Sequence, residues 1–438
     1  MTSLAPAQLR LAYFGDDFTG STDALEFLAR AGLRTALFLE PPSRERLAAM
    51  PPLDAVGVAG LTRSLPPAEM ETVLRPAFAA LRGLAPRHVH YKVCSTFDSS
   101  PQIGSIGRAI DVGVSIFGGR YVPLLVGAPA LGRYCAFGNL FARMGIGSDG
   151  EIFRLDRHPS MSRHPVTPAD EADLRLHLAK QTAKRIGLFD VLKLDLPAGD
   201  AHAALERLVA GGAEIVLFDV MRAEQLARIG ALIDSAAGDA PAFSVGSSGI
   251  EMALGAHWAE QGSVRSRTDW PPPARVDRML VVSGSCSPVT AGQIDWALAH
   301  GFVGVPLDAH TLAIDPAIAA AREALRAGKS PIVFTARGQQ TAAPAPAAKL
   351  GRALGTISRI LVESESLSRV LVAGGDTSSY AARALGVEAV EMIAPLAPGA
   401  PLCRAHSTSR AVDGLEVNFK GGQVGAPDYF GAVQRGAL

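Results

Sequence analysis

Five short polar turns combine glycine with charged or hydroxyl side chains, and each directly follows an apolar run. They occupy residues 14–23, 91–107, 283–293, 373–379 and 418–425. An apolar run, a polar turn and an amphipathic stretch in that order are typical of a strand, a ligand-binding loop and a helix. Hydroxyls, cations and backbone N–H groups in such loops bind sugar and phosphate groups. The sequence therefore contains candidate sites for a polyhydroxylated anion and for phosphate.

Two adjacent carboxylates, Asp16 and Asp17, follow the first apolar run. Side chains of neighbouring residues point in different directions where the backbone is extended. One carboxylate could then bind a substrate hydroxyl while the other contacts a cation or caps the next helix. A plain turn with a helix cap explains the pair equally well, and both interpretations stay open.

The most complex turn reads YKVCSTFDSSP. Lys92 supplies a positive charge beside the hydroxyls of Ser95 and Thr96 and the carboxylate of Asp98, which suits an anionic, polyhydroxylated ligand. The alternative is a serine-rich loop in which Ser100 caps a helix. That alternative explains one or two residues and leaves the rest of the cluster without a role.

Three glycine turns lie in the C-terminal part of the chain, and they read SGSCSPVT, AGGDTS and KGGQVG. Small residues let the backbone approach a ligand closely, and N–H groups at a helix start attract anions. One such turn would be a weak signal because glycine is common. Three in one domain, two of them rich in hydroxyls, favour a nucleotide phosphate site.

Several other motifs lack residues that the known binding sites they resemble require. The AGKS string at 327–330 lacks the earlier glycine of a phosphate-binding loop, because Glu323 stands there. No GxGxxG fingerprint with a following acidic residue opens a βαβ unit, which counts against a dinucleotide-binding dehydrogenase. His88 and His90 share one face of an expected strand, where packing is the plainer interpretation.

Short apolar runs alternate with longer amphipathic stretches along almost the whole chain. Expected strands cover residues 11–14, 35–39, 55–59, 89–93, 122–126, 191–194, 214–218, 242–245, 279–282, 303–306, 331–334, 370–373, 387–393 and 415–419. Expected helices include residues 23–31, 171–185 and 201–210. This alternation predicts parallel βαβ units in an α/β fold, with sheets covered on both faces.

The clearest boundary is the segment 263–275, which reads SVRSRTDWPPPAR. Three consecutive prolines resist both a helix and a central strand, so we expect a stiff linker. The predicted domains are residues 1–265 and 276–438, each of ordinary domain size. A second Pro/Ala-rich stretch, 341–348, is expected to form a loop inside the second domain.

Composition excludes several classes of protein. The 438 residues carry 42 basic and 42 acidic side chains, and 48% are hydrophobic. This is a globular composition without the basic surplus of a nucleic-acid scaffold. No apolar run has the length of a membrane span, and the first ten residues show no secretory pattern. Four scattered cysteines without a CxxC pair indicate a protein of the reducing cytoplasm.

Together these motifs resemble the four-carbon acid sugar kinase family. The resemblance rests on DDFTG from Asp16, TRS from Thr62, the KVCSTFDSSP string from Lys92 and the three glycine turns, in the family's order along essentially the whole chain. It implies two α/β domains with largely parallel sheets and an active-site cleft between them. The first domain would bind the sugar acid and the second ATP. Such enzymes phosphorylate the terminal hydroxyl of a tetronate or 3-oxo-tetronate, and related members act on short branched sugar acids.

The resemblance also assigns residues to each ligand. The residues expected to face the sugar acid are Asp16, Asp17, Arg63, Lys92, Ser95, Thr96 and Asp98. The residues expected to face the nucleotide are Ser283, Gly284, Ser285, Ser287, Gly374, Gly375, Asp376, Thr377 and Gly422. ATP and Mg²⁺ are the implied cofactors, with the metal ligands unassigned.

Phosphoryl transfer depends on positioning and charge neutralisation, which suggests a role for each predicted side chain. Lys92 and Arg63 would hold the substrate carboxylate, and Lys92 also counts among the catalytic residues. Asp17 or Asp98 would orient, and could deprotonate, the attacking hydroxyl. The backbone N–H groups of the turns from Gly284 and Gly374 would hold the phosphates.

The chain departs from the family pattern at three places. Asp376 stands where many relatives carry Glu, the last turn lacks the Ser and Asn of a KSGNFG string, and HPVTP at 164–168 matches an HPMTP string only in part. Two other classes stay open, a non-catalytic sugar-acid or nucleotide sensor and an NAD-dependent hydroxy-acid oxidoreductase. We expect a small sugar acid as partner, no nucleic acid and no membrane. The exact acid and a homo-oligomeric state are left open.

Overall fold

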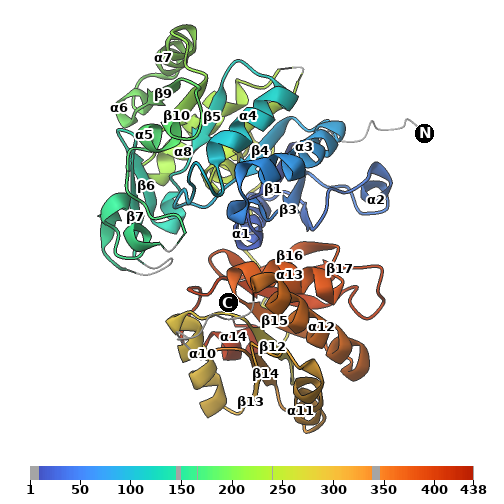
Figure 1. The fold of residues 1–438 in the computed structure, drawn as a ribbon. Helices are drawn as coiled ribbons and strands as arrows, with labels where there is room; N and C mark the ends of the chain where they lie inside the picture. The colour runs from blue at the N-terminus through green and yellow to red at the C-terminus, as the bar shows by residue number, and fades with distance from the viewer. Residues whose placement is uncertain (1–8, 145–148, 165, 239, 338–345, 438) are drawn as a thin grey trace, which may run out of the picture. The chain divides into compact units, whose positions relative to one another are not determined.

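The computed structural model describes residues 9–144, 149–164, 166–238, 240–337 and 346–437, without the side chain of Asp376. Within this description the chain forms two compact units (Figure 1). Unit 1 contains residues 9–16, 27–35 and 41–268, and unit 2 contains residues 17–26, 36–40 and 269–437. The change of unit after Thr268 falls inside the predicted linker, where no helix or strand forms between Ser263 and Arg278.

Unit 1 is built on a sheet of parallel strands. In spatial order the strands are β3 (Ala55–Ala59), β1 (Leu11–Gly15), β4 (His88–Lys92), β11 (Ala242–Gly246), β5 (Val122–Leu125), β10 (Ile215–Phe218) and β9 (Ile186–Phe189). Every residue of the first six strands is buried. Their apolar runs therefore belong to a sheet covered on both faces.

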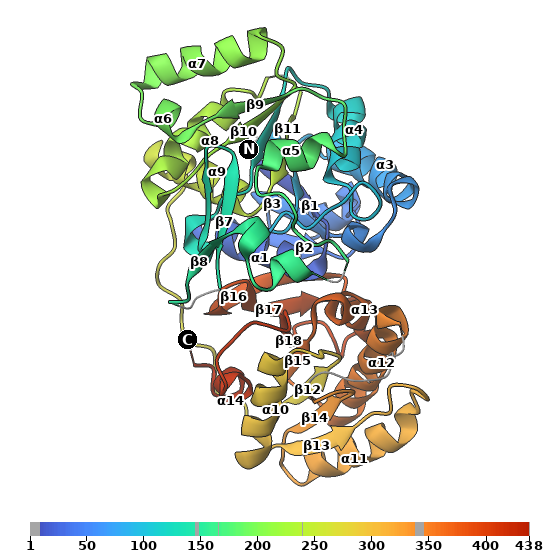
Figure 2. The same ribbon diagram turned by 60° about the vertical axis from the view of Figure 1, so that its left-hand side comes forward.

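Helices cover both faces of this sheet (Figure 2). On one face lie α3 (Pro67–Gly83) and α4 (Ile106–Phe117), and on the other lie α8 (Leu226–Asp234) and α9 (Gly249–Glu260). Four further helices of this unit are α2 (Arg44–Ala48), α5 (Leu174–Ala179), α6 (Val191–Leu194) and α7 (Ala198–Ala210). An aromatic cluster around Phe78, which contacts Phe14, Tyr91, Phe117 and Phe243, fills the core beneath α3 and α4.

A small antiparallel sheet in unit 1 was not predicted. It consists of β6 (Arg133–Ala136), β7 (Asn139–Arg143) and β8 (Ile152–Arg154). The β6–β7 turn places Phe137 and Gly138 at positive φ, as a two-residue hairpin requires. The buried Asp219 carboxylate accepts hydrogen bonds from both turn N–H groups, at 2.5 and 2.9 Å. Burial nevertheless raises the pKa of Asp219.

Unit 2 has a mixed sheet. Its order is β13 (Val303–Pro306), β14 (Pro331–Phe334), β12 (Leu280–Ser283), β15 (Arg369–Ala373), β18 (Glu416–Lys420), β17 (Ala400–His406), β16 (Ala389–Ala397) and β2 (Thr35–Phe38). The first five strands are parallel, and the pairs from β18 to β2 are antiparallel.

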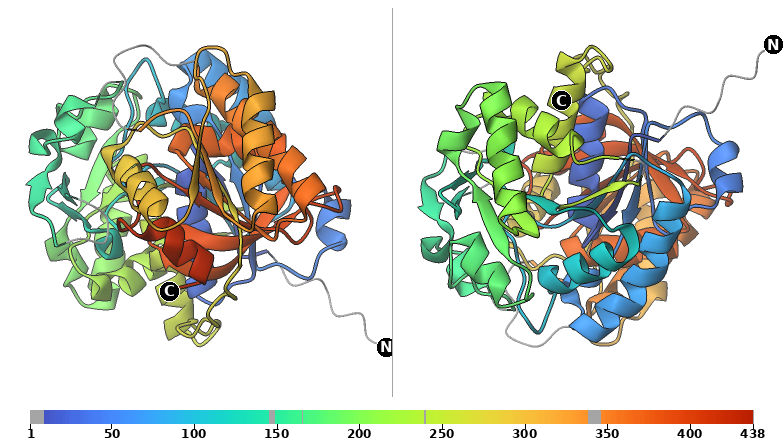
Figure 3. Two further views of the ribbon diagram at one scale, coloured as in Figure 1. Left: turned by 90° about the horizontal axis from the view of Figure 1, so that it is seen from below. Right: turned by 90° about the horizontal axis from the view of Figure 1, so that it is seen from above.

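The two faces of the unit 2 sheet carry different helices (Figure 3). The helices α10 (Pro288–Ala299) and α14 (Tyr429–Arg435) lie on one face. On the other face lie α11 (Ile314–Arg326), α12 (Ala347–Glu365) and α13 (Gly375–Leu385). Residues 18–26 of α1 (Phe18–Arg30) also belong to this unit, where the Phe18 ring packs on Phe419 with centroids 4.7 Å apart. Glu26 of the same helix accepts a hydrogen bond from Gly399 N at 2.9 Å.

Two local predictions were wrong, and the alternative weighed for Ser100 also does not form. Residues 191–194, expected as a strand, form α6, because Asp190 caps them through a hydrogen bond from Lys193 N. Only residues 174–179 of the expected helix 171–185 are helical. Ser100 caps no helix; α4 begins after Ser105, whose hydroxyl accepts from Arg108 N. Residues 341–345 of the predicted loop lie outside the described residues, and α12 begins at Ala347.

None of the helices in the described ranges has the length and apolarity needed to cross a bilayer.

Candidate functional site

The carboxyl ends of three adjacent strands in unit 1 bring predicted residues together. Gly15 at the end of β1 lies opposite Ala59 of β3 and Lys92 of β4. The next residue, Asp16, donates its N–H to Lys92 O at 2.8 Å and accepts from Arg63 N at 3.0 Å. Asp16 is therefore joined through the backbone to both predicted cationic residues.

The side chain of Arg63 is directed to Asp16. Its Nε donates to Asp16 Oδ2 at 3.1 Å, and its terminal nitrogen donates to Oδ1 at 2.8 Å. The carboxylate is buried, whereas the Arg63 side chain is 27% exposed. Such a two-point ion pair fixes the plane of the guanidinium group. A bound carboxylate would have to share Arg63 with Asp16, which the sequence did not indicate.

Lys92 ends β4 and is buried, with its Nζ donating to Val93 O at 3.0 Å. Beyond it, residues 94–97 form a turn closed by the hydrogen bond from Phe97 N to Cys94 O. Phe97 has φ +57°, an uncommon conformation for a bulky residue. This turn places Ser95, Thr96 and Asp98 on one short loop after the strand.

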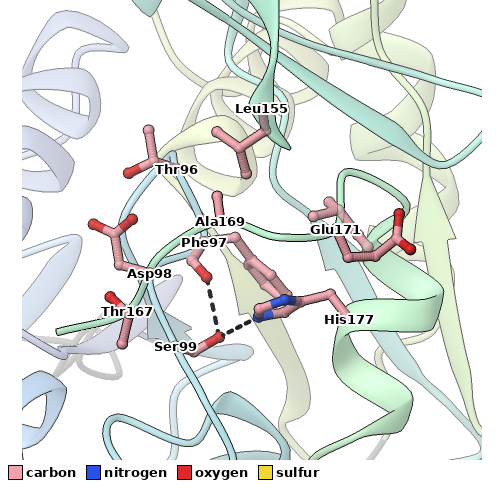
Figure 4. Close-up of a pocket in the computed structure, with 10 residues that line it drawn as sticks. Thr96, Phe97, Asp98, Ser99, Leu155, Thr167, Ala169, Glu171 and His177 are labelled. Carbon is pink, nitrogen blue, oxygen red and sulfur yellow. Dashed lines mark hydrogen bonds between the residues drawn. The ribbon is translucent and has the colours of Figure 1, made fainter. Parts of the chain in front are cut away.

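A serine–histidine contact holds the far end of this loop. Ser99 Oγ lies 3.0 Å from Phe97 O and 3.0 Å from His177 Nε2, and it accepts from Gln181 Nε2 at 2.9 Å (Figure 4). Ser99 has one hydroxyl proton, so all three bonds form together only when His177 carries its proton on Nε2. Burial lowers the pKa of His177 and favours this neutral form.

A small cavity lies between the loop and the segment from Leu155 to His177. Its lining includes Thr96, Asp98, Thr167 and Glu171, whose side chains are drawn in Figure 4. Its volume is about 10 Å³, room for roughly one water molecule. The cavity is too small for a sugar acid. Thr167 belongs to the 164–168 segment, where Pro165 lies outside the described residues, and it contacts His164 Nδ1 at 3.0 Å.

Cys94 is a packed thiol. Its Sγ lies 2.9 Å from Thr96 Oγ1. Burial, assisted by the charge of Asp98, raises the pKa of Cys94 to about 11. A thiol in that state is a poor nucleophile at neutral pH.

The two predicted aspartates of the first turn have different surroundings. Asp17 caps α1: its Oδ1 accepts from Gly20 N at 2.7 Å and its Oδ2 accepts from Thr19 Oγ1 at 2.8 Å. It belongs to unit 2, whereas Asp16 belongs to unit 1. The partly exposed Asp98, by contrast, accepts no hydrogen bond from the other described residues.

In unit 2 the three predicted turns emerge from one edge of the sheet. Ser283, Ala373 and Lys420 lie side by side at the ends of the parallel strands β12, β15 and β18. Gly284 N donates to Ala373 O at 3.1 Å, and Gly374 N donates to Lys420 O at 2.9 Å. The predicted nucleotide residues are therefore assembled at the carboxyl end of the sheet, the usual position of ligands in α/β folds.

Glycines allow these turns to approach one another. A Cβ on Gly284 would lie 2.6 Å from Thr377 Oγ1, and one on Gly422 would lie 2.7 Å from Ser285 Oγ. Gly374, at φ +127°, caps α13. Gly375 follows it as the first residue of the helix, and the side chain of Asp376 lies outside the description.

The serines bind backbone rather than each other. Ser285 N donates to Ser283 Oγ at 3.4 Å, Ser287 N donates to Ser285 Oγ at 3.2 Å, and Val289 N donates to Ser287 Oγ at 3.2 Å. Several N–H groups expected to hold phosphate thus already have partners within the protein.

Two residues of this edge were not predicted as site residues. Lys420 Nζ donates to Thr290 Oγ1 at 3.0 Å, and that hydroxyl donates to Gly422 O at 2.8 Å. One signal in the sequence was available: lysine is rare here, with seven in 438 residues, and two of them fall in the polar turns.

The described residues contain no cluster of three or more metal-ligating side chains.

Two family models match this chain, one in each of its two parts. Residues 11–254 match the family model of a sugar-binding N-terminal domain, and residues 280–430 match that of a nucleotide-binding C-terminal domain. The chain is 46% identical to a 3-oxo-isoapionate kinase of Paraburkholderia graminis, over 99% of this chain and 96% of that protein. It is 33% identical to a 3-oxo-tetronate kinase of Methylobacterium radiotolerans, over 97% and 98% of the two chains.

A solved structure from Salmonella typhimurium LT2 has the same fold, with a TM-score of 0.78 and 25% identity over 99% of this chain and 100% of that one. Fold and matched domains define a two-domain sugar-acid kinase. The chain belongs to the four-carbon acid sugar kinase family. The predicted α/β fold of two domains, the family and the kinase activity are thereby confirmed. The individual site residues and the cleft between the domains stay predictions.

Proposed function

We propose that this protein transfers the terminal phosphoryl group of ATP to a hydroxyl of a short, branched sugar acid of the 3-oxo-isoapionate class. The proposed substrate class rests on one observation, the difference in sequence identity to two kinds of kinase. Identity to the 3-oxo-isoapionate kinase is 46%, whereas identity to 3-oxo-tetronate kinases of seven other bacteria lies between 26% and 33%. Because all these alignments span nearly the whole chain, the difference does not come from a missing domain.

The polar edge of unit 1 supports binding of the sugar acid. Lys92 and the Arg63–Asp16 pair provide cationic groups at the ends of β4 and β3, where a carboxylate would be held. Ser95 and Thr96 offer hydroxyls that can donate to a keto oxygen and accept from a substrate hydroxyl. Asp16 would hold Arg63 in one orientation before the substrate arrives.

The turns of unit 2 fit a nucleotide. Gly284 and Gly422 pack closely against the hydroxyl side chains of Thr377 and Ser285, which brings the turns before α10 and α13 together. The N-terminal ends of helices attract phosphate. ATP supplies the phosphoryl group, and Mg²⁺ bound mainly by phosphate oxygens and water would neutralise its charge. Ser283, Ser285, Ser287, Gly375, Asp376 and Thr377 complete the proposed site.

The attacking hydroxyl needs a carboxylate that orients it and accepts its proton. Asp17 and Asp98 are the proposed candidates. Asp98 is partly exposed and accepts no hydrogen bond from other described residues, so its oxygens are available to a substrate. Asp17 already accepts two hydrogen bonds at the start of α1 and would act in catalysis while it caps the helix.

The test is ADP release from ATP and Mg²⁺ with a panel of acids. The panel contains 3-oxo-isoapionate, the 3-oxo-tetronates, and the D and L forms of threonate and erythronate. We expect the highest kcat/KM with 3-oxo-isoapionate, and phosphorylation at a terminal hydroxyl by ³¹P–¹³C correlation NMR. A preference for a 3-oxo-tetronate would overturn the substrate class. ATP binding without turnover on any acid would favour the sensor.

A further inference from the structure

Lys420 is a buried lysine, and no carboxylate among the described side chains, which leave out that of Asp376, forms an ion pair with it. It is the last residue of β18 and its exposed fraction is 0%. Its Nζ donates to Thr290 Oγ1 at 3.0 Å. Burial lowers the pKa of Lys420 to about 7.

Burial of the Lys420 ammonium group lowers the stability of the ligand-free protein. An ammonium group has three N–H donors, and a buried charge is normally paired and fully hydrogen-bonded. Thr290 supplies one neutral acceptor, and its own proton goes to Gly422 O at 2.8 Å. A buried lysine whose partner among the described side chains is one hydroxyl is what a site for an anion would contain before the anion binds.

The position of Lys420 identifies the anion. Its carbonyl accepts from Gly374 N, the cap of α13, and its side chain reaches Thr290 in the first turn of α10. Both helices have more than ten residues, and their N-terminal ends carry partial positive charge. Lysine and helix ends acting together are a common means of binding phosphate.

We propose that Lys420 is a phosphate-binding residue of the nucleotide site and that its ammonium group pairs with phosphate oxygens of ATP and ADP. This inference rests on the proposed function, because it requires unit 2 to bind the nucleotide. The competing role is structural: Lys420 could serve only to connect β18 to α10 through Thr290.

The two roles differ in what removal of the charge does. If Lys420 binds phosphate, Lys420→Met should weaken ATP and ADP about 10- to 100-fold, the usual loss for one charge-assisted contact. Adenosine has no phosphate, so its affinity should change less than about twofold. The ligand-free variant should be at least as stable as the parent protein, because a buried charge without a counter-charge among the described side chains has been removed.

The experiment is calorimetric titration of the full chain with ATP, ADP and adenosine, together with thermal unfolding without ligand. Lys329→Met is the matched control, because Lys329 is exposed and precedes β14, at the opposite edge of the sheet. This control should bind all three ligands as the parent does. Lys420→Gln provides a second neutral variant in case the methionine does not fold.

The outcomes separate the two proposals. A parent protein that binds no ATP would overturn the nucleotide site and the inference together. A parent that binds ATP, with neutral variants that bind it equally well, would overturn the inference alone. Equal losses for ATP and adenosine, with a lower Tm without ligand, would assign Lys420 the structural role. Loss restricted to ATP and ADP supports phosphate binding.

Discussion

Arg63 donates two hydrogen bonds to the two carboxylate oxygens of Asp16, at 3.1 and 2.8 Å, although the residues are 47 positions apart in sequence. The pair forms because β3 and β1 are parallel neighbours whose ends lie at the same edge of the sheet. Both residues were predicted to face the sugar acid. Their ion pair supports the proposal that Asp16 orients Arg63 and that Arg63 contacts the substrate.

This relationship predicts a non-additive pair of mutations. Asp16→Asn should raise the KM for the sugar acid roughly 10-fold and Arg63→Met roughly 100-fold, with the KM for ATP little changed. The KM of the double variant for the sugar acid should be no higher than that of Arg63→Met. Asp16 acts on the substrate through Arg63, so its loss has no further effect once Arg63 is replaced. Steady-state kinetics with the acid varied measures this, and strictly multiplicative effects would show that the two residues act independently.

The candidate bases can be separated because Asp17 also caps a helix. Asparagine is as good a cap as aspartate, so Asp17→Asn should keep the free energy of unfolding within about 1 kcal/mol. If Asp17 is the base, kcat should fall about 10²- to 10⁴-fold with ATP binding intact. Asp98→Asn made in parallel tests the alternative. If a variant retains near-normal kcat, the aspartate replaced in it is not the catalytic base.

The strands could be predicted because buried parallel strands are continuous apolar runs. Residues 55–59 and 331–334 match the largely buried strands β3 and β14 to the residue. Residues 303–306 also match β13, in which Val305 is the one buried residue. The same signal fails at residues 191–194: the run VLKL was predicted as a strand, but Asp190 caps it and it forms a helix. The partly exposed strands β6, β7 and β8 have no such run.

The site was predictable as a set of turns and not as a set of contacts. The residue types at strand ends indicated which segments hold ligands. The partners of Arg63 and Lys420 depend on which strands are neighbours, which the sequence does not state. The same holds for Ser99, whose histidine partner comes from a helix that was predicted with the wrong bounds.

The contact of Ser99 predicts a positioning effect on the substrate loop. Ser99→Ala leaves Gln181 Nε2 without this acceptor and removes the hydrogen bond to Phe97 O. We expect a loss of about 1–2 kcal/mol in stability. The KM for the sugar acid should rise several-fold while the KM for ATP is unchanged. Ser99→Thr, which keeps the hydroxyl, should recover part of the KM. A change confined to stability would show that the loop keeps its geometry without Ser99.

Two neighbouring glycines offer a matched test of the nucleotide turn. A Cβ at position 422 would lie 2.7 Å from Ser285 Oγ and 3.0 Å from Ser287 Cβ, whereas a Cβ at 421 meets Val424 Cγ2 at an ordinary 3.5 Å. Gly422→Ala should therefore displace the serine turn and raise the KM for ATP about 10-fold, the effect of 1–2 kcal/mol of strain. Gly421→Ala should be close to the parent. Equal effects would exclude steric crowding at Gly422 as the cause.

His88 predicts the direction in which pH changes stability. It is fully buried at β4, its Nε2 lies 2.8 Å from Asp234 Oδ1, and its Nδ1 has no partner in the described structure. Burial lowers the pKa of His88, although Asp234 opposes the shift. The unfolded chain, with a histidine pKa of about 6.5, therefore binds a proton that the folded protein excludes. Stability is complete above that pH and falls as the pH drops below it.

Urea unfolding between pH 7.5 and 5 measures this slope. His88→Gln keeps a donor near the Nε2 position and does not titrate, so its stability should fall less steeply than that of the parent. The slope should not vanish, because burial also lowers the pKa of His158 and His177. Glu206→Gln, which alters an exposed ion pair with Arg120, is the control and should reproduce the parent slope. Identical slopes for the parent and His88→Gln would show that His88 takes up its proton equally in the folded and unfolded states.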